Sequence, residues 1–557
     1  MARQTNRLSI ALAQLNPLVG DIKGNAEKVM AARAEAAAAK ADLVVFSELF
    51  LVGYPPEDLV LKPAFQRQVA ATLENLILYT LLNPGPALLL GLPWEKDGRL
   101  YNASMLIDGG HMVAVSCKRH LPNYGVFDEL RIFAQGRMPR PIDFRGVKLG
   151  VMICEDIWKA DIARHLQQEG AEILIISNGS PFTVSKSRER FDHAAARVTE
   201  TGLPLIYVNQ LGGQDELVFD GASFVLSCDA RTAVQLPRWE ERVVTTHLKR
   251  GENGWDCGAG ERAVLEGDTE AIYLAAMMGL RDYVDKNHFP GVVLGFSGGI
   301  DSALSAAIAA DALGADRVHC VMLPFDYTSN ESLEDAAACA GALGAPYDII
   351  PIRPAVQAFE AMLHPFFQGL EADTTEENIQ PRVRAVVLMA LSNKFGNMVL
   401  TTGNKSEMSV GYATLYGDMC GGYNVLKDIY KTQVFELARW RNHHHPKGAL
   451  GPDCAVIPQN IIDKPPTAEL KENQKDEDSL PPYDVLDEIL IDLVEKDMSV
   501  TEITALGFDR GLVKRIEHLL FIAEYKRRQA PPGVKVGVKN FGRDRRYPIT
   551  NGFRDAE

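Results

Sequence analysis

The sequence lacks any apolar run long enough to cross a membrane. A membrane-spanning helix needs about 20 consecutive apolar residues, whereas the first apolar stretch is short and is interrupted by Gln14 and Asn16. No cleavage pattern typical of a secretion signal follows that stretch. We therefore expect a cytoplasmic protein that does not use a membrane as a partner.

Cysteine is scarce and widely spaced. The chain has eight cysteines in 557 residues, with no CxxC pair and no histidine at the spacing of a zinc site. Neither a disulfide framework nor a structural zinc ion is expected. The triplet His443, His444 and His445 is predicted to be a loop, because adjacent side chains rarely converge on one metal ion.

Positive charge is in deficit. There are 58 Lys and Arg residues against 73 Asp and Glu, which gives a net charge of -15. That balance argues against nucleic acid or an anionic membrane as the main partner and favours small-molecule substrates.

The content of 46% hydrophobic and 24% charged residues is typical of a soluble globular protein. At about 150 residues per domain, the length predicts at least two domains.

Short apolar runs recur from Ile10 to about Leu236, and each ends in polar or turn residues. Helix-like segments such as the alanine-rich residues 26–41 alternate with them. This alternation predicts an α/β sandwich. The pattern stops in a polar, glycine-rich stretch, so we expect a first domain over residues 1–245, a linker over residues 246–267 and a second domain over residues 268–557.

Four strand-like runs separated by helix-like segments occupy residues 291–404. Strands that alternate with helices predict βαβ units and a doubly wound parallel sheet, in which ligands bind at the carboxyl ends of the strands. The acidic segment 471–484 is predicted to be a surface loop.

The first of these runs ends in a glycine-rich turn that leads into an alanine-rich helix. The turn consists of Ser297, Gly298, Gly299, Ile300, Asp301 and Ser302. Two glycines permit a tight turn, and free amide N–H groups at a helix N-terminus bind anions. The simpler alternative is an ordinary turn with Asp301 or Ser302 as the helix cap, but six matched residues between a strand and a helix favour a phosphate loop. It is not a Walker A loop, because GxxxxGK[ST] does not occur in the chain.

The SGGxDS pattern resembles the pyrophosphate loop of the ATP-pyrophosphatase superfamily, whose members adenylate a carboxyl or carbonyl group. Residues 401–434, 461–470 and 541–550 resemble the NAD+ synthetases of that superfamily. The resemblance implies a Rossmann-like fold of the adenine nucleotide alpha hydrolase type, with ATP as a substrate and Mg²⁺ held by Asp301 and Glu407.

The same resemblance implies further binding residues. Asn378 and Arg382 are one helical turn apart on one face, where that family contacts nicotinic acid adenine dinucleotide. The implied ATP-binding residues are the six loop residues with Thr402, Lys431 and Thr467, and the implied dinucleotide-binding residues are Asn378, Arg382, Glu407 and Asp418.

Three chemically complementary residues follow apolar runs in the first domain. Cys154 ends the run VKLGVMIC, Glu48 ends DLVVFSE, and Lys118 follows a third run. A lone cysteine is more often a small buried hydrophobe. A free thiol is only a few per cent ionised at neutral pH, so a nucleophilic cysteine needs a nearby base. A cysteine, a carboxylate and a lysine at three strand ends therefore predict an active site.

The segments around these three residues resemble the amidase branch of the nitrilase superfamily, which implies an α-β-β-α sandwich. The resemblance implies that Glu48 is the base, that Cys154 attacks the carboxamide of glutamine and that Lys118 stabilises the oxyanion. The implied glutamine-binding residues are Tyr124, Glu129, Ser180 and Lys186.

Together the two resemblances imply a ligase that adenylates nicotinic acid adenine dinucleotide with Mg-ATP and then amidates it with ammonia from glutamine. The expected partners are these small molecules and further copies of the chain in a homo-oligomer. Two alternatives remain. One is another glutamine-dependent ligase of the ATP-pyrophosphatase type with a different acceptor, against which residues 376–393 and 464–470 argue. The other is a non-catalytic chain that only senses glutamine, against which the three residues at the strand ends argue.

Overall fold

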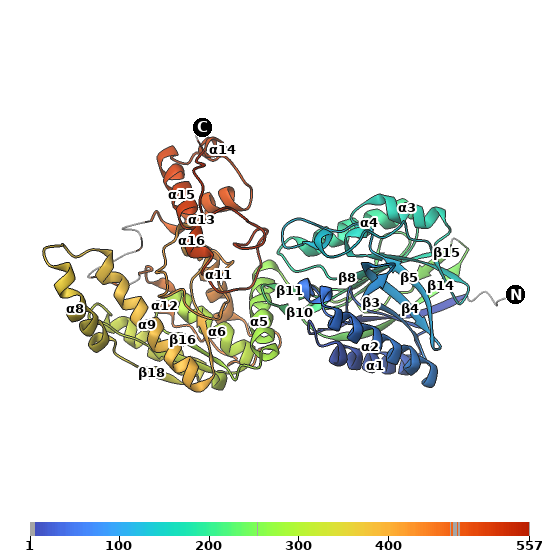
Figure 1. Cartoon of the computed structure of the whole chain (residues 1–557), viewed down its shortest axis with the longest axis horizontal. Helices are drawn as coiled ribbons and strands as arrows, with labels where there is room; N and C mark the ends of the chain where they lie inside the picture. The colour runs from blue at the N-terminus through green and yellow to red at the C-terminus, as the bar shows by residue number, and fades with distance from the viewer. Residues whose placement is uncertain (1–5, 253, 468, 472–475, 477–479, 556–557) are drawn as a thin grey trace. The chain divides into compact units, whose positions relative to one another are not determined.

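The structure is a computed structural model that describes residues 6–252, 254–467, 469–471, 476 and 480–555. The contacts of the chain divide it into two compact units, Met1–Glu266 and Gly267–Glu557 (Figure 1). Within the described part of the chain, no helix combines the length and the apolar character that a membrane span requires.

Two β-sheets form the centre of the first unit. One has the strand order β15-β14-β1-β2-β3-β4-β5 and the other the order β13-β12-β9-β8-β7-β6, while β10 and β11 form a separate hairpin. The strands are β1 (Arg7–Gln14), β2 (Leu43–Val45), β3 (Ala87–Lys96), β4 (Arg99–Asp108), β5 (His111–Cys117), β6 (Ile142–Phe144), β7 (Val147–Ile153), β8 (Ile173–Asn178), β9 (Leu205–Asn209), β10 (Leu211–Gln214), β11 (Leu217–Asp220), β12 (Phe224–Leu226), β13 (Thr232–Gln235), β14 (Arg242–Gly251) and β15 (Gly254–Cys257).

The two sheets pack face to face, and helices cover their outer faces. Leu12 and Val45 of the first sheet share one buried cluster with Val151 and Ile175 of the second. Apolar residues of α1 and α2 pack on the first sheet, and those of α3 and α4 on the second (Figure 1). The α-β-β-α prediction is therefore confirmed. The helices are α1 (Ile22–Ala38), α2 (Pro63–Leu82), α3 (Ala160–Gln168) and α4 (Lys186–Thr201), with the short turns η1 (Glu57–Leu61), η2 (Glu129–Arg131) and η3 (Cys154–Ile157).

The segment that we predicted to be a linker contains strands. β14 pairs antiparallel with the whole length of β1, and β15 pairs with β14. Trp255 and Cys257 are buried in the cluster between the sheets. The linker prediction is therefore wrong for residues 246–251 and 254–257. The alternation of apolar and polar residues is short there and is interrupted by glycines, so the local pattern gave no sign of pairing with the first strand of the chain.

A five-stranded sheet with the order β18-β17-β16-β19-β20 forms the centre of the second unit. All neighbouring strands are parallel, which confirms the predicted doubly wound sheet. The order reverses between β16 and β19, so the crevice at the carboxyl ends of these two strands is the expected ligand site. The strands are β16 (Val292–Gly295), β17 (Val318–Met322), β18 (Tyr347–Ile349), β19 (Met398–Thr401) and β20 (Tyr423–Asn424).

Helices pack against this sheet and around its carboxyl end. Val356 of α8 and Leu388 of α9 share a buried cluster with Val293 and Val399 of the sheet. Apolar residues of α13, α14 and α15 form a second cluster together with Val410 of α10. The helices are α5 (Asp268–Lys286), α6 (Ile300–Leu313), α7 (Asn330–Leu343), α8 (Arg353–Phe367), α9 (Thr374–Phe395), α10 (Lys405–Val410), α11 (Lys431–His443), α12 (Gln459–Asp463), α13 (Tyr483–Val494), α14 (Val500–Ala505), α15 (Arg510–Ile522) and α16 (Glu524–Arg527), with η4 (Ala315–Arg317).

Residues 533–540 are fastened to α10 through a buried ion pair. Lys405, the first residue of α10, is fully buried, and its Nζ lies 2.6 Å from the carboxylate of Asp428. The other oxygen of that carboxylate accepts hydrogen bonds from the backbone N–H groups of Val536 (2.8 Å) and Gly537 (2.7 Å). Breaking a buried ion pair costs about 3–5 kcal/mol. These residues are therefore part of the core that supports α10.

Two minor predictions concern loops. His443 is the last residue of α11 rather than a loop residue, and the rings of His443 and His444 hydrogen-bond the backbone oxygens of Arg439 and Trp440 through Nδ1. The wrong prediction reflects the difficulty of locating a helix end that has no glycine after it. Half of the predicted surface loop 471–484 lies outside the described residues, and its last two residues, Tyr483 and Asp484, begin α13 instead of lying in a loop.

Candidate active sites

The three candidate catalytic residues of the first unit lie at the carboxyl ends of strands. Lys118 directly follows β5, Cys154 directly follows β7 as the first residue of η3, and Glu48 lies three residues after β2. The backbone of Cys154 has a φ angle of 46°, a left-handed conformation that few residues other than glycine adopt. Strained turns of this kind are characteristic of residues that must present a nucleophile at the end of a strand.

Lys118 is enclosed between two carboxylates. Its Nζ lies 2.6 Å from Oε1 of Glu48 and 2.9 Å from Oε1 of Glu129, and the lysine and Glu48 are fully buried. The side-chain amide of Asn102 donates to Oε1 of Glu48 (2.7 Å), and the backbone N–H of Gly179 donates to Oε2 (3.1 Å). Four hydrogen bonds between separate segments therefore hold Glu48 and Lys118 in one geometry.

The charges of this cluster follow from burial and pairing. Burial acts to lower the pKa of Lys118, but the carboxylates of Glu129 and Glu48 outweigh it and raise that pKa well above its usual value. Burial and then Glu48 raise the pKa of the Cys154 thiol, against the opposing effect of Lys118. Burial likewise raises the pKa of Glu129 to about 7. The resting site at neutral pH thus contains a charged ammonium group and a protonated thiol, so the thiol needs a base before it can attack.

The four residues that we predicted to bind glutamine are placed differently from one another. Glu129 is part of the cluster itself, and the hydroxyl of Tyr54 donates to it at 2.9 Å. Sequence reasoning missed Tyr54 and the direct contact of Glu129 with Lys118, because both depend on loop conformations without a local pattern. Tyr124 is half exposed and donates to the carboxylate of Glu155 at 2.9 Å.

The remaining two predicted glutamine-binding residues lie on the segment after β8 and at the start of α4. The buried Ser180 accepts a hydrogen bond through Oγ from Nε of Arg190 at 3.1 Å. Nζ of Lys186 lies 4.0 Å from the ring centroid of Trp158 and 3.1 Å from the carboxylate of Glu189. Trp158 directly follows η3, so Lys186 is connected to the nucleophile turn through that ring.

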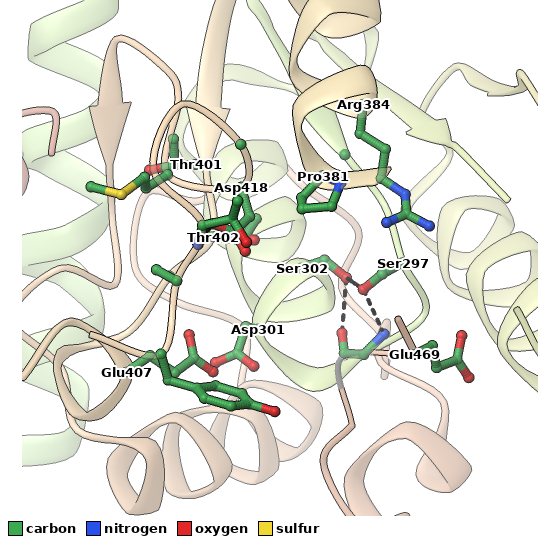
Figure 2. A pocket seen from close by; sticks show the side chains of 18 of the residues that line it. Ser297, Asp301, Ser302, Pro381, Arg384, Thr401, Thr402, Glu407, Asp418 and Glu469 are labelled. Atoms are coloured by element: carbon green, nitrogen blue, oxygen red, sulfur yellow. Dashed lines mark hydrogen bonds between the residues drawn. The ribbon is translucent and has the colours of Figure 1, made fainter. Parts of the chain in front are cut away.

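In the second unit, the predicted phosphate loop joins β16 to the N-terminus of α6. Gly298 has a φ angle of 75°, and a Cβ atom there would lie 2.4 Å from the backbone oxygen of Ser332. Oγ of Ser297 accepts a hydrogen bond from the backbone N–H of Gly299 (3.2 Å), and Ser302 donates from Oγ to the oxygen of Gly299 (2.9 Å) (Figure 2). The loop therefore has one position at which only glycine fits, and it directs the amide end of a helix toward the adjoining cavity.

A cavity of about 590 Å³ opens beside this loop. Figure 2 shows Asp301 and Glu407 with their carboxylates near each other on its wall. Two predicted residues do not line the cavity: Gly298, which is the buried residue of the loop's tight turn, and Arg382. The predicted residues that line it are Ser297, Gly299, Ile300, Asp301, Ser302, Asn378, Thr402, Glu407, Asp418, Lys431 and Thr467.

The two carboxylates at the cavity share one ammonium group. Nζ of Lys431 lies 2.5 Å from Asp301 and 3.3 Å from Glu407. Asn404 donates from Nδ2 to Asp301 at 2.8 Å. Burial raises the pKa of Glu407 to about 8, and Lys431 opposes this rise. The pair of carboxylates is thus stable only with positive charge beside it.

These residues fit a magnesium ion of the kind that is bound together with phosphate. Mg²⁺ prefers hard oxygen ligands and keeps several waters, so one or two carboxylates suffice when phosphate supplies the remainder. Among the described residues, no group of three or more His, Cys, Asp or Glu side chains could hold a metal ion by itself. Asp301 and Glu407 would therefore hold the ion only in company with a ligand's oxygens.

In the structure, the two arginines at positions 382 and 384 of α9 have different surroundings. Arg382 is exposed and donates from Nε to the backbone oxygen of Leu415 at 3.2 Å. Arg384 lines the cavity instead and donates from Nε to the oxygen of Leu323, at the end of β17, at 2.9 Å. Residues two apart on a helix point in nearly opposite directions. The sequence pattern therefore identified the helix but not which of its arginines faces the cavity.

Comparison with known proteins relates both units to described families. The family model described as carbon-nitrogen hydrolase matches residues 9–254, and the one described as NAD synthase matches residues 272–530. The glutamine-dependent NAD(+) synthetase of Rhodobacter capsulatus is 54% identical over 551 residues, which cover 99% of this chain and 100% of that protein. The protein of the same description from Acinetobacter baylyi is 44% identical over 98% of both chains.

A solved structure is similar over the full length as well. It is that of glutamine-dependent NAD+ synthetase from Acinetobacter baumannii in complex with ADP. It is 41% identical, has a TM-score of 0.77 and covers 99% of this chain and 100% of its own. The two resemblances indicated by the sequence are therefore confirmed.

Replacing Gly298 with alanine tests the geometry of the phosphate loop. A left-handed backbone costs a non-glycine residue about 1–2 kcal/mol, and the added Cβ would also clash with the backbone of Ser332. We expect Gly298→Ala to lower the free energy of unfolding by about 2 kcal/mol or more, measured as a lower thermal midpoint. Gly299→Ala is the matched control, because Gly299 has a φ angle of −92°. An equal loss in both variants would contradict the assigned geometry.

Proposed function

The chain belongs to the family of glutamine-dependent NAD(+) synthetases, and we infer that it makes NAD+ from nicotinic acid adenine dinucleotide, ATP and glutamine. The enzyme is a carbon–nitrogen ligase whose other products are AMP, pyrophosphate and glutamate. The observation that carries this proposal is that one chain contains both a buried cluster of Cys154, Lys118 and Glu48 and a phosphate loop that opens onto a large cavity.

In the first unit, we propose that Glu48 takes the thiol proton of Cys154 as the sulfur attacks the carboxamide carbon of glutamine. The ammonium group of Lys118 stabilises the oxyanion that forms. Glu48 then returns the proton to the departing nitrogen, ammonia leaves and a thioester remains, which water hydrolyses to glutamate. The 2.6 Å contact of Lys118 with Glu48 supports these roles, because it brings the base and the oxyanion-stabilising charge to one place.

Glutamine itself is proposed to contact Tyr124, Glu129, Ser180 and Lys186. The position of Glu129 on Lys118 supports a second role for it. Because it shares the ammonium group with Glu48, the ionised form of Glu129 adds a second negative charge that favours protonated Lys118 while Glu48 exchanges its proton.

In the second unit, we propose that the amides of residues 297–302 and the ammonium group of Lys431 bind the phosphates of ATP, together with Thr402 and Thr467. The carboxylate of nicotinic acid adenine dinucleotide attacks the α-phosphorus, pyrophosphate leaves, and ammonia then displaces AMP from the acyl adenylate. When bound at Asp301 and Glu407, Mg²⁺ would neutralise charge on the phosphate oxygens.

The acceptor is proposed to contact Asn378, Glu407 and Asp418, which line the same cavity. Arg384 also lines it and donates only from Nε in the described contacts, so its remaining N–H groups can meet an anionic group of a substrate. Arg382 remains a proposed contact, although it lies outside the cavity.

A cytoplasmic location and a homo-oligomer also remain proposals. The exposed apolar side chains of Met362, Phe366 and Leu370 support the homo-oligomer.

The choice of acceptor is tested by supplying ATP and an ammonium salt with different carboxylates. We expect AMP release with nicotinic acid adenine dinucleotide to exceed the release with other acceptors by at least about 10⁴-fold, because a site built for polar groups strongly rejects compounds that leave them unpaired. AMP can be separated and quantified by chromatography. Equal release with a mononucleotide or a small carboxylate would identify a different ligase.

The separation of the two chemistries is tested by Cys154→Ala. We expect glutamine-driven NAD+ synthesis to fall by at least about 10³-fold, because the nucleophile is lost, while synthesis from ammonium salts changes by less than about threefold. Cys228→Ala is the matched control, since Cys228 lies in the same unit away from the cluster. Loss of both activities in a folded Cys154→Ala protein would refute this division.

Asp301→Asn tests the proposed metal site at nearly constant volume. We expect both glutamine-driven and ammonium-driven synthesis to fall by at least about 10²-fold, because charge stabilisation at the phosphates is lost. A chelator should have the same effect on the parent protein, and added Mg²⁺ should reverse it. Asp316→Asn, which changes an exposed carboxylate of the same unit, should leave both activities unchanged. Full ammonium-driven activity in Asp301→Asn would exclude the assigned role.

A further inference from the structure

Asp156 joins two chain segments that carry catalytic residues of the first unit. It lies in η3, two residues after Cys154, and is 2% exposed. Its Oδ1 accepts hydrogen bonds from the backbone N–H groups of Arg119 (3.1 Å) and His120 (2.8 Å). Its Oδ2 accepts one from the N–H of Ile153 (3.2 Å). A single buried carboxylate thus binds three backbone amides.

These amides adjoin Lys118 and Cys154, and the separation of the ammonium group and the thiol matters for the reaction. Arg119 and His120 directly follow Lys118, and Ile153 directly precedes Cys154. The amides therefore fix the backbone beside the ammonium group on one side and beside the thiol on the other.

No β-ladder sets this separation, because β5 and β7 belong to different sheets. The sheets meet through apolar side chains, and such contacts have little directional preference. Ser116 also donates to the oxygen of Val151 across the same gap, at 3.3 Å, but it is a neutral bond further from the two reacting groups. Tyr124 donates to the carboxylate of Glu155 at 2.9 Å as well, but Tyr124 is half exposed. Asp156 provides a buried, charged and directional connection that binds the backbone of both segments.

The nucleophile turn requires such a connection. Cys154 has a left-handed backbone, and conformations of that kind persist only where surrounding contacts determine them. The bond from Ile153 to Asp156 closes this turn. Burial raises the pKa of Asp156 to about 6, while its bond to His120 and the charge of Lys118 act to lower it. Above that pH the carboxylate is ionised, and both oxygens accept hydrogen bonds.

We propose that Asp156 is a positioning residue that sets the distance between the ammonium group of Lys118 and the thiol of Cys154. This role rests on the proposed function of the first unit and adds a residue to which that mechanism assigned nothing. A displacement of about 1 Å in a catalytic group can cost about 10²-fold in rate. The proposal therefore predicts a catalytic defect without a binding defect.

Asp156→Asn keeps the volume but cannot keep all three bonds. Its amide nitrogen must face either Ile153 or the pair Arg119 and His120, which places a donor against a donor. We expect the kcat of glutamine hydrolysis to fall about 10²-fold, while the KM for glutamine changes by less than about threefold. Ammonium-driven synthesis should stay within about twofold of the parent, which reports that the second unit is intact.

Asp156→Glu and Asp161→Asn complete the experiment. The glutamate retains a carboxylate that can reach part of the amide set, so its kcat should lie between those of the parent and Asp156→Asn. Asp161 also contacts this segment, but only through the His120 side chain at 3.0 Å and with partial exposure. Asp161→Asn should therefore have parental kcat and KM.

The outcomes separate the proposal from the mechanism on which it rests. A folded Asp156→Asn protein with a kcat within threefold of the parent, or with the loss in KM alone, would overturn the positioning role. If Asp156→Asn does not fold, Asp156→Glu decides: a kcat equal to that of the parent, or a loss in KM alone, would overturn the role. Glutamine hydrolysis that survives Cys154→Ala would instead overturn the proposed function of the first unit.

Discussion

Three lysine ammonium groups are almost completely removed from water, and each is held between two carboxylates. Lys118 lies between Glu48 and Glu129, Lys431 between Asp301 and Glu407, and Lys405 between Asp428 and Glu495. A buried charge without a partner is strongly destabilising, so each lysine determines where its carboxylates lie. In the first case, Glu48 is also the proposed base. In the second, both carboxylates are the proposed metal ligands. In the third, the pair supports the helix that carries Glu407.

Each unit has a sharp backbone turn after a strand at its proposed active site, and the two units make this turn with different residues. Both bring reactive groups to the carboxyl ends of strands, where the backbone must turn sharply. At the phosphate loop, the turn is made by Gly298, which adopts a positive φ angle at little cost. At the nucleophile, a cysteine must occupy the turn, so its left-handed backbone has to be held by its surroundings. This difference explains why the first site depends on a buried hydrogen-bond network, whereas the second can rely on glycine.

Much of the fold and part of each site could be predicted because their signals are local. Apolar runs mark the strands, and Cys154 and the phosphate loop each directly follow one. The pairing of β14 with β1 could not be predicted, since it joins opposite ends of the first unit. The helical pattern around Arg382 and Arg384 gives their spacing but not the direction of the cavity. The contacts of Glu129 and Asp156 depend on loop conformations, which no short sequence pattern specifies.

The contact of residues 533–540 with Lys405 and its partner Asp428 also affects the order in which the two units can fold during synthesis. Chains emerge from the ribosome N-terminus first, at about 5–20 residues per second. The first unit has all its strands once residue 257 has emerged, whereas α10 lacks its partners until about half the chain later. For a period on the order of tens of seconds, a nascent chain therefore has the complete sequence of the unit proposed to release ammonia before it has that of the unit proposed to consume it. The order of the two units along the gene decides which half-reaction can exist alone.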